Sequence, residues 1–201
     1  MAREKDPGKR NAILSAAKRL FAERGFHDAS VSDLARETGL PVGSIYTYFE
    51  NKEALFRTII DEGWEDFFRA LARTLDAADG PERKLSLIVY RVLPGLFEDG
   101  DLISLVLAEA DRGVGLDEKL QRLAALVGSV VVELARKKGL AFDFPENLAM
   151  SALSIFFLGS LDTIRLSRSA ALAIGPDDII AFIGLAIENS FGIKIERPSG
   201  P

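Results

Sequence analysis

Cysteine is absent from the 201-residue chain, and histidine occurs once, at His27. Without thiols there are no disulfides, thiolate metal sites or cysteine nucleophiles, and a single imidazole gives little basis for a histidine zinc site or histidine catalysis. A glycine-rich nucleotide loop is missing too. We therefore expect no metal, no cofactor and no enzymatic activity.

A long apolar run is also lacking. The longest extends from Leu148 to Leu161 before Asp162 interrupts it, whereas a membrane-spanning helix needs about 18 apolar residues. The start of the chain, Met1 to Pro7, does not contain the apolar stretch of a secretion signal. The sequence predicts a buried helix over 148–161 and a cytoplasmic protein.

Charge is unevenly distributed. The net charge of −5 would by itself argue against a nucleic acid as a partner. Residues 1–52, however, hold nine Lys/Arg and seven Asp/Glu, whereas residues 53–201 hold sixteen and twenty-three. Near the start we expect a flexible arm that reaches phosphates through Arg3, Lys5, Lys9 and Arg10. The acidity of the whole chain is therefore no obstacle to DNA binding by its first quarter.

Apolar residues recur at helical spacing through almost the whole chain, with no β-alternation, repeat or low-complexity tract. The spacing predicts helices over 13–21, 30–38, 42–49, 52–77, 82 into the nineties, 102–110, 120–134, 145–173 and 176–191. Gly25 and Gly39 are expected to stop helices, and Pro94 to kink or end one. The fold class is all-α with about nine helices.

The stretch from Ala29 to Phe56 reads ASVSDLARETGLPVGSIYTYFENKEALF. Two helices of about eight residues with a turn at Gly39 between them are the geometry of a helix-turn-helix. Ile45 and Phe49, one turn apart, form the buried face of the second helix, so its other side chains point outward. This geometry presents a helix to the DNA major groove. Ser30 and Asp33 have the spacing of a capping box at the first helix.

These residues resemble the tetracycline-repressor (TetR) family of bacterial regulators. The matching motifs are Ile13-Leu14-x-Ala16-Ala17-x-x-Leu20-Phe21, Gly25-Phe26, Val31-x-Asp33-Leu34-Ala35 and Gly43-Ser44-Ile45-Tyr46-x-Tyr48-Phe49-x-Asn51-Lys52-Glu53-x-Leu55-Phe56. They cover residues 9–57 in order and spacing, whereas the remainder agrees only in length and helical character. The resemblance implies a helix-turn-helix DNA-binding domain over 1–51 and an effector-binding and dimerisation domain over 52–201.

The resemblance also implies DNA contacts. Backbone phosphates are expected to meet Tyr46, Tyr48 and Lys52, while base edges are expected to meet Val42, Gly43, Ser44 and Thr47. Ser32 is balanced between starting its helix and contacting a phosphate. The tyrosines could instead be core aromatics, and Lys52 could be a solvated surface charge.

Two departures from the family pattern affect the second helix. Pro41 stands where a capping serine is common, so the helix cap is expected to be weaker or shifted. Val42 occupies a place that is often polar, which favours contact with a thymine methyl over a hydrogen bond.

The last two helices are over-apolar for surface elements. In the helix over 148–161 apolar residues cover more than one face, with Ile155 and Leu158 away from the main stripe. The last helix carries Ile179, Phe182 and Ile187 among its apolar residues. A helix that is apolar on two faces needs two partners. We expect a homodimer through these two helices, and the alternative is that both are core helices of the monomer.

The middle helices are then expected to enclose a cavity for a small effector. Aromatic and aliphatic side chains and three polar groups are the candidate ligand contacts: Trp64, Phe67, Phe68, Tyr90, Phe97, Leu105, Val106, Glu109, Phe156, Asp162 and Arg165. Taken singly, each aromatic is better explained as a core residue than as a ligand contact, and Asp162 and Arg165 could simply pair along their helix.

Together these observations indicate a sequence-specific DNA-binding transcriptional regulator. We expect a homodimeric repressor that occupies a palindromic operator and is released by a small apolar or amphipathic effector. The alternatives are an activator of the same fold, a helical adaptor that does not bind DNA and, from another class, an enzyme.

Overall fold

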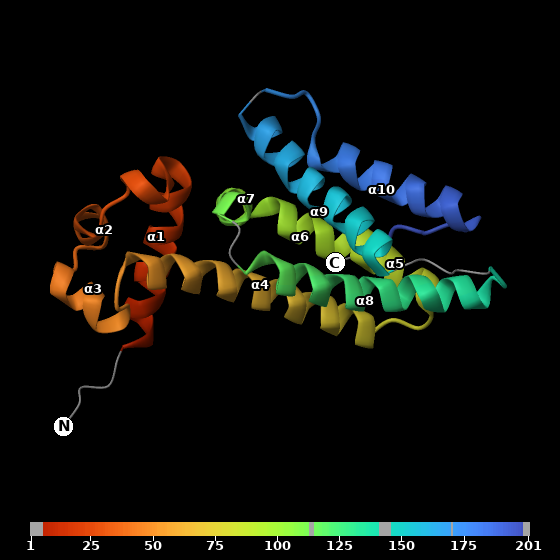
Figure 1. Ribbon diagram of the computed structural model, residues 1–201, viewed down its shortest axis with the longest axis horizontal. Coiled ribbons are helices and arrows are strands. Elements are labelled where there is room, and N and C mark those ends of the chain that lie inside the picture. The colour runs from red at the N-terminus through yellow and green to blue at the C-terminus, as the bar shows by residue number, and fades with distance from the viewer. Residues whose placement is uncertain (1–5, 113–114, 141–145, 170, 199–201) are drawn as a thin grey trace.

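The computed structural model describes residues 6–112, 115–140, 146–169 and 171–198 (Figure 1). Within these ranges the chain is helical and contains no strand, which confirms the all-α fold class. The elements are α1 (Pro7–Asp28), α2 (Val31–Thr38), α3 (Val42–Tyr48), α4 (Lys52–Asp76), α5 (Pro81–Leu87), η1 (Ile88–Val92), α6 (Leu93–Glu98), α7 (Gly100–Arg112), α8 (Leu116–Lys137), α9 (Glu146–Arg168) and α10 (Pro176–Phe191). Nine helices result when α5, η1 and α6 are counted as one.

Two parts of the molecule are joined by α4. Helices α1–α3 form a headpiece at one end, and α4 leaves it to run beside α8 through the remainder, here called the body (residues 52–198) (Figure 1). The first turns of α4 also pack against α1, where Phe56 contacts the rings of Phe21 and Phe26. The hydrophobic core is thus continuous from headpiece to body. The domain boundary at residue 51 stays a prediction.

Helix α1 begins earlier than predicted. The Asp6 carboxylate accepts a hydrogen bond of 2.8 Å from the backbone N–H of Gly8, and Pro7 occupies the first turn, where its missing N–H costs nothing. Lys9 and Arg10 consequently lie in the helix, so the prediction of a flexible arm is wrong for them. Arg3 and Lys5 lie outside the described residues. Gly25 ends the regular helix as predicted, with φ 79°.

Helix α2 has half of the expected capping box. The Ser30 hydroxyl oxygen accepts from the Asp33 N–H at 3.1 Å, but the Asp33 carboxylate bonds the Ser30 hydroxyl at 2.6 Å. Gly39 then supplies the left-handed residue that ends α2, with φ 68°. At α3, Pro41 provides no side-chain cap, as its residue type predicts.

The helix that contains Pro94 does not break there. Instead α5 passes into the π-helical turn η1, in which the N–H of Leu93 bonds the carbonyl of Ile88, and α6 continues to Glu98. A wider turn before a proline relieves the crowding that its ring would cause in an α-helix. Helix α9 ends at Arg168, five residues earlier than predicted, while its predicted start at Pro145 lies outside the described residues.

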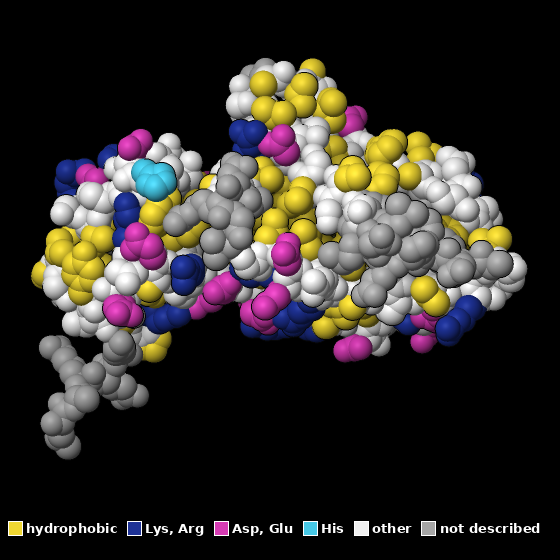
Figure 2. Space-filling model, in the orientation of Figure 1, with side chains coloured by type: hydrophobic (Ala, Val, Ile, Leu, Met, Phe, Trp, Pro, Cys, Tyr) yellow, Lys and Arg dark blue, Asp and Glu magenta, His cyan; other side chains and the backbone are white. Residues whose placement is uncertain are grey.

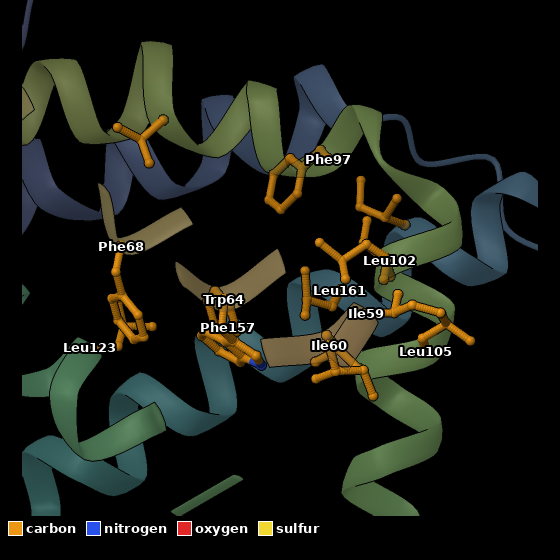
Figure 3. Close-up of a cluster of buried hydrophobic side chains, with 14 of the residues drawn as sticks. Ile59, Ile60, Trp64, Phe68, Phe97, Leu102, Leu105, Leu123, Phe157 and Leu161 are labelled. Atoms are coloured by element: carbon orange, nitrogen blue, oxygen red, sulfur yellow. The ribbon is translucent and has the colours of Figure 1, made fainter. Parts of the chain in front are cut away.

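The core of the body centres on α4. Trp64 stacks on Phe68 and lies against Phe157 of α9, with centroid separations of 5.5 Å in both pairs, and Leu161, Phe97 and Leu102 close the cluster from α9, α6 and α7 (Figure 3). Small residues permit close helix approach at one crossing, because a Cβ on Gly63 would lie 2.5 Å from the side chain of Leu102. Among the described residues no helix is long and apolar enough to span a membrane.

Candidate DNA-binding interface and apolar cavity

Helix α3 is divided into a buried and an exposed face. Ile45 and Phe49, the residue directly after the helix, are buried in the headpiece core, as their spacing predicts. On the other face Tyr46 is 48 % exposed, and Val42, Gly43 and Thr47 are exposed beside it, while Ser44 is half-buried. An exposed aromatic next to small side chains leaves a face that can approach another surface closely. Ser32, at the start of α2, is also exposed.

Tyr48 has a different environment from Tyr46. It is half-buried, packs against the core, and its hydroxyl oxygen accepts a hydrogen bond of 3.2 Å from the N–H of Asp6. The tyrosine thereby joins the end of α3 to the start of α1. Of the two tyrosines predicted to meet phosphates, Tyr46 is thus the more accessible.

Lys52 is engaged inside the protein. Its Nζ donates to the carbonyl oxygens of Phe26 at 2.8 Å and Ala29 at 3.0 Å, and lies 4.4 Å from the centre of the Phe26 ring. The ammonium therefore binds the carbonyl end of α1, where a positive charge is favoured. Sequence reasoning offered a phosphate contact or a solvated charge, and did not include this third role. Asn51, the preceding residue, caps the start of α4 by accepting from the Ala54 N–H at 2.7 Å.

The helix-turn-helix carries one tightly held carboxylate. Asp33 accepts from the Ser30 hydroxyl and lies 2.6 Å from Arg36 and 3.6 Å from Arg24. The Ser30 hydrogen bond and the two guanidinium groups lower the pKa of Asp33 below its usual value, against a smaller opposing effect of burial. Through Arg24 this ion cluster links α1 to α2.

Two ion pairs join the headpiece to the body. Lys18 of α1 lies 2.5 Å from Asp99, in the turn between α6 and α7, and Arg10 lies 2.5 Å from Glu62 of α4. The same turn is held from α9, because Arg168 donates to the carbonyls of Phe97 at 3.0 Å and Glu98 at 2.9 Å. Residues 97–99 therefore contact the headpiece, the body core and α9 together.

The body contains a partly open apolar cavity of about 290 Å³. Two serines are the polar members of its described wall. The hydroxyl of one of them, Ser160, donates a hydrogen bond of 2.5 Å to the Phe156 carbonyl. The described wall residues are Phe67, Leu71, Leu85, Ile88, Val89, Leu93, Phe97, Leu123, Val127, Val131, Leu153, Phe156, Phe157, Ser160, Ile183, Ala186, Ile187, Ser190 and Phe191. A cavity of this size and character suits an apolar molecule or chain.

Three of the candidate ligand contacts, Phe67, Phe97 and Phe156, lie on this wall. The others do not, for identifiable reasons. Phe68 and Leu105 are core residues, and the guanidinium of Arg122 covers Phe68 at 4.1 Å. Trp64 and Val106 border a much smaller void beside the cavity.

The polar candidates and Tyr90 are turned to other partners. Glu109 lies 3.4 Å from Lys119, which also bonds Asp61 at 2.9 Å. Asp162 and Arg165 form an exposed ion pair at 2.5 Å along α9, which is the alternative to ligand binding that their spacing allowed. Tyr90 packs against Gly184 of α10 and beneath Arg197. Most of the wall consists instead of Leu, Ile and Val, and one signal for it was available: the stripe of Leu123, Val127 and Val131.

Helices α9 and α10 leave an apolar face uncovered. Ile155 is 72 % exposed and Phe182 60 % exposed, and Phe156 and Leu185 accompany them. The rings of Phe156 and Phe182 lie 6.4 Å apart, so the two helices contribute to one surface. Hydrophobic side chains are visible over these helices along the upper edge of the body (Figure 2). Phe157, Leu161 and Ile164 face inward on α9, which is therefore apolar on both sides as predicted.

Comparison with known proteins gives consistent results for the sequence and the fold. Residues 13–59 match the family described as bacterial regulatory proteins, tetR family. The chain is 30 % identical over 158 residues to an uncharacterized HTH-type transcriptional regulator of Bacillus subtilis, YdgC, covering 76 % of this chain and 70 % of that protein.

Solved structures of other bacterial regulators share the fold. The transcriptional regulator FadR from Bacillus subtilis in complex with stearoyl-CoA has a TM-score of 0.71 at 20 % identity and covers 90 % of this chain and 97 % of its own. The fatty acid degradation regulator FadR from Bacillus halodurans also has a TM-score of 0.71, at 26 % identity, and covers 90 % of this chain and 94 % of its own. The exposed helix-turn-helix, the helical body behind it and these relatives agree: the chain belongs to the tetR family of bacterial regulatory proteins and is a helix-turn-helix transcriptional regulator.

Proposed function

We propose that this regulator is a homodimeric repressor whose α3 helices occupy successive major grooves of a palindromic operator, and that an acyl-chain effector in the body cavity releases it. The observation that carries the proposal is the division of α3, with Ile45 and Phe49 buried and Val42, Tyr46 and Thr47 exposed. A helix presented in this way can enter a groove of about 12 Å.

The DNA contacts are divided by chemistry. Val42, Gly43, Ser44 and Thr47 approach base edges, where the Val42 side chain suits a thymine methyl. Tyr46, and after local adjustment Tyr48, bond phosphates, and Ser32 does so from the start of α2. Lys52 acts here mainly through α1, whose end it fixes, although its charge adds to the field that attracts phosphates.

The second copy covers the apolar face of α9 and α10. One helix-turn-helix reads few base pairs, so affinity and discrimination require two half-sites about 34–36 Å apart. Ile155, Phe156, Phe182 and Leu185 supply the aromatic and aliphatic centre that such an interface needs, and they come from neighbouring helices. Four helices, two from each copy, then form the contact.

The effector class follows from the cavity wall and the relatives. Nineteen described residues line the cavity, and nearly all of them are apolar. A relative of the same fold was solved with stearoyl-CoA, and another regulates fatty acid degradation. An acyl chain matches this wall because burial of methylene groups stabilises its complex, by about 0.8 kcal/mol each.

The test is operator binding measured by fluorescence anisotropy, with DNA from upstream of the gene and a salt titration. Tyr46→Ala is expected to bind about tenfold more weakly, with an unchanged salt slope and an unchanged dimer, because the lost phosphate contact is an uncharged hydrogen bond. Leu140→Ala, at an exposed apolar residue of the body, is the matched control. Equal affinity of Tyr46→Ala and the wild type would overturn the assignment, and no binding to any upstream DNA would favour an adaptor. Reporter output after deletion of the gene separates a repressor from an activator.

A further inference from the structure

Three voids meet at one aromatic side chain. Phe67 of α4 lies on the wall of the 290 Å³ cavity, on the wall of an open groove between α1, α4 and α6, and on the wall of a small void of about 10 Å³. Among the described residues no other lines all three. Phe67 is half-buried, and its ring lies 6.0 Å from those of both Trp64 and Phe157. Phe67 is therefore the side chain that the cavity, the groove and the small void have in common.

The small void adjoins an unsatisfied donor. Trp64 lies on its wall and is 4 % exposed, and its indole Nε1–H is buried with no hydrogen-bond acceptor among the described residues. Figure 3 shows the Trp64 indole beside Phe157, which borders both the void and the cavity. A buried N–H without an acceptor costs free energy that a bound acceptor recovers. The void has room for about one oxygen atom or one water molecule.

The surroundings of this donor are otherwise apolar. The void is bordered by Leu96, Leu102, Ile103, Val106 and Leu161 in addition to the aromatic residues. A hydrogen bond formed there is not weakened by competing polar groups, so it discriminates between a ligand with an oxygen at the right position and one without it.

We propose that the effector is an apolar chain bearing a carbonyl oxygen, that Trp64 Nε1–H donates to this oxygen, and that Phe67 is the gate between the cavity that holds the chain and the groove that receives the polar end. This assignment rests on the proposed effector function of the cavity. It adds the hydrogen-bonding residue, the point of entry and the length of chain.

The chain length follows from the volume. An engineered apolar cavity of about 150 Å³ holds one benzene molecule. A cavity of about 290 Å³ therefore holds roughly two such volumes, or about a dozen carbon atoms. We expect longer chains to extend past Phe67 into the neighbouring groove.

The experiment uses the full-length protein and matched probes, 2-dodecanone and dodecane, delivered from cyclodextrin. Trp64 is the only tryptophan in the chain, so its single indole N–H resonance reports on this site alone. The ketone is expected to shift this resonance downfield and to bind about tenfold more tightly than the alkane by calorimetry. In Trp64→Phe, which keeps an aromatic ring, the ketone and the alkane bind equally.

A second variant tests the gate. Phe67→Ala keeps the preference for the ketone but moves the best chain length in a series of methyl ketones from about twelve carbons to longer chains. Phe68→Leu, which changes the neighbouring ring but lines none of the three voids, leaves the length unchanged.

The outcomes are distinguishable. If the ketone binds without moving the indole resonance, or keeps its advantage in Trp64→Phe, the proposed hydrogen bond is overturned. If Phe67→Ala leaves the length series unchanged, the gate is overturned. If neither probe binds, the effector half of the proposed function fails as well, whereas operator binding of the same preparation still tests the DNA half.

Discussion

The headpiece and the body are stabilised in different ways. In the headpiece, polar groups fix the helices to one another at short range: Lys52 binds the end of α1, Tyr48 accepts from Asp6, and Asp33 joins α1 to α2. In the body, apolar side chains from α4 to α10 surround a cavity, and the ion pairs lie on its outside. The helices of the headpiece are therefore linked by polar contacts in addition to their apolar core, whereas the described wall of the cavity is almost wholly apolar.

This difference suits the two tasks of a regulator. A reading surface must keep its shape to distinguish base sequences, while a binding cavity must couple its occupancy to a change in the spacing of two headpieces. The following predictions test this contrast, and the first concerns the face of α9 and α10 that we propose as the dimer contact.

The largest effect is expected from a charge in the exposed apolar face of the body. Phe182→Asp places a carboxylate in the middle of the proposed dimer contact, where it would be desolvated without a partner. We expect monomers in analytical ultracentrifugation, and operator affinity that falls about a hundredfold or more because two linked half-site contacts become one. Leu140→Asp puts the same charge on an exposed apolar residue elsewhere. A dimeric Phe182→Asp protein would place the interface on another surface.

The next effect is expected in the headpiece. Lys52→Met keeps most of the side-chain stem but removes the ammonium that bonds the Phe26 and Ala29 carbonyls. The free energy of unfolding is expected to fall by about 2 kcal/mol in urea titrations without DNA, because two carbonyls lose a charged donor. If stability is unchanged and only the salt slope of operator binding falls, Lys52 acts as a phosphate contact and not as a connection to α1.

Lys52 also shows why the sequence predicts these two regions unequally. In the headpiece, order and spacing of many residues fix the helices, and the division of α3 into Ile45 and Phe49 on one side and Tyr46 on the other follows from helical periodicity. The ammonium of Lys52 bonds carbonyl oxygens at the end of α1 because the fold brings that end beside the start of α4. No local sequence pattern specifies this contact.

In the body the sequence predicts the helices better than the cavity. The stripe of Leu123, Val127 and Val131 was readable as a buried face, but whether buried residues meet each other or a void depends on how helices distant in sequence pack. Aromatic residues were predicted to line the cavity because they are large, yet Phe68 is buried in the core instead. The turn η1 was missed because a π-helical turn leaves the apolar spacing around Pro94 nearly unchanged.

A smaller effect is expected where the two regions communicate. Lys18→Ala removes the ion pair with Asp99, whose turn also carries the cavity residue Phe97. Both charged side chains are partly exposed, so stability is expected to change by less than about 1 kcal/mol. The factor by which 2-dodecanone weakens operator binding is expected to fall severalfold.

The matched control for this link is Arg69→Ala, which breaks an ion pair with Asp66 inside α4 and joins no two parts of the molecule. Arg69→Ala should leave unchanged the factor by which 2-dodecanone weakens operator binding. A Lys18→Ala protein that responds to the ketone like the wild type would show that the signal travels along α4 alone.

The smallest effect concerns acid. The pKa of Asp33 is lowered in the folded protein by its hydrogen bond from Ser30 and by the charges of Arg36 and Arg24, so folding favours the ionised form. Its contribution to stability is therefore present above the ordinary carboxyl pKa of 3.8 and is lost as the pH falls through the lowered folded value. Asp33→Asn should narrow the gap between the melting temperatures at pH 7 and pH 3, while Tyr46 remains exposed and the dimer intact.

The body offers the corresponding test at the end of α10. The pKa of Glu188 is lowered by a hydrogen bond from Lys194 and by the N–H of Ile195, which hold the segment after α10 in place. Glu188→Gln should also narrow the gap between the melting temperatures at pH 7 and pH 3. The Glu188 carboxylate too loses its contribution to stability as the pH falls through its lowered pKa. Hydrogen exchange separates the two sites: acid should loosen α1 and α2 through Asp33, and the segment after α10 through Glu188. If acid exposes the same amides in Asp33→Asn and Glu188→Gln, the headpiece and the body open as one unit. The two regions would then not differ in stability.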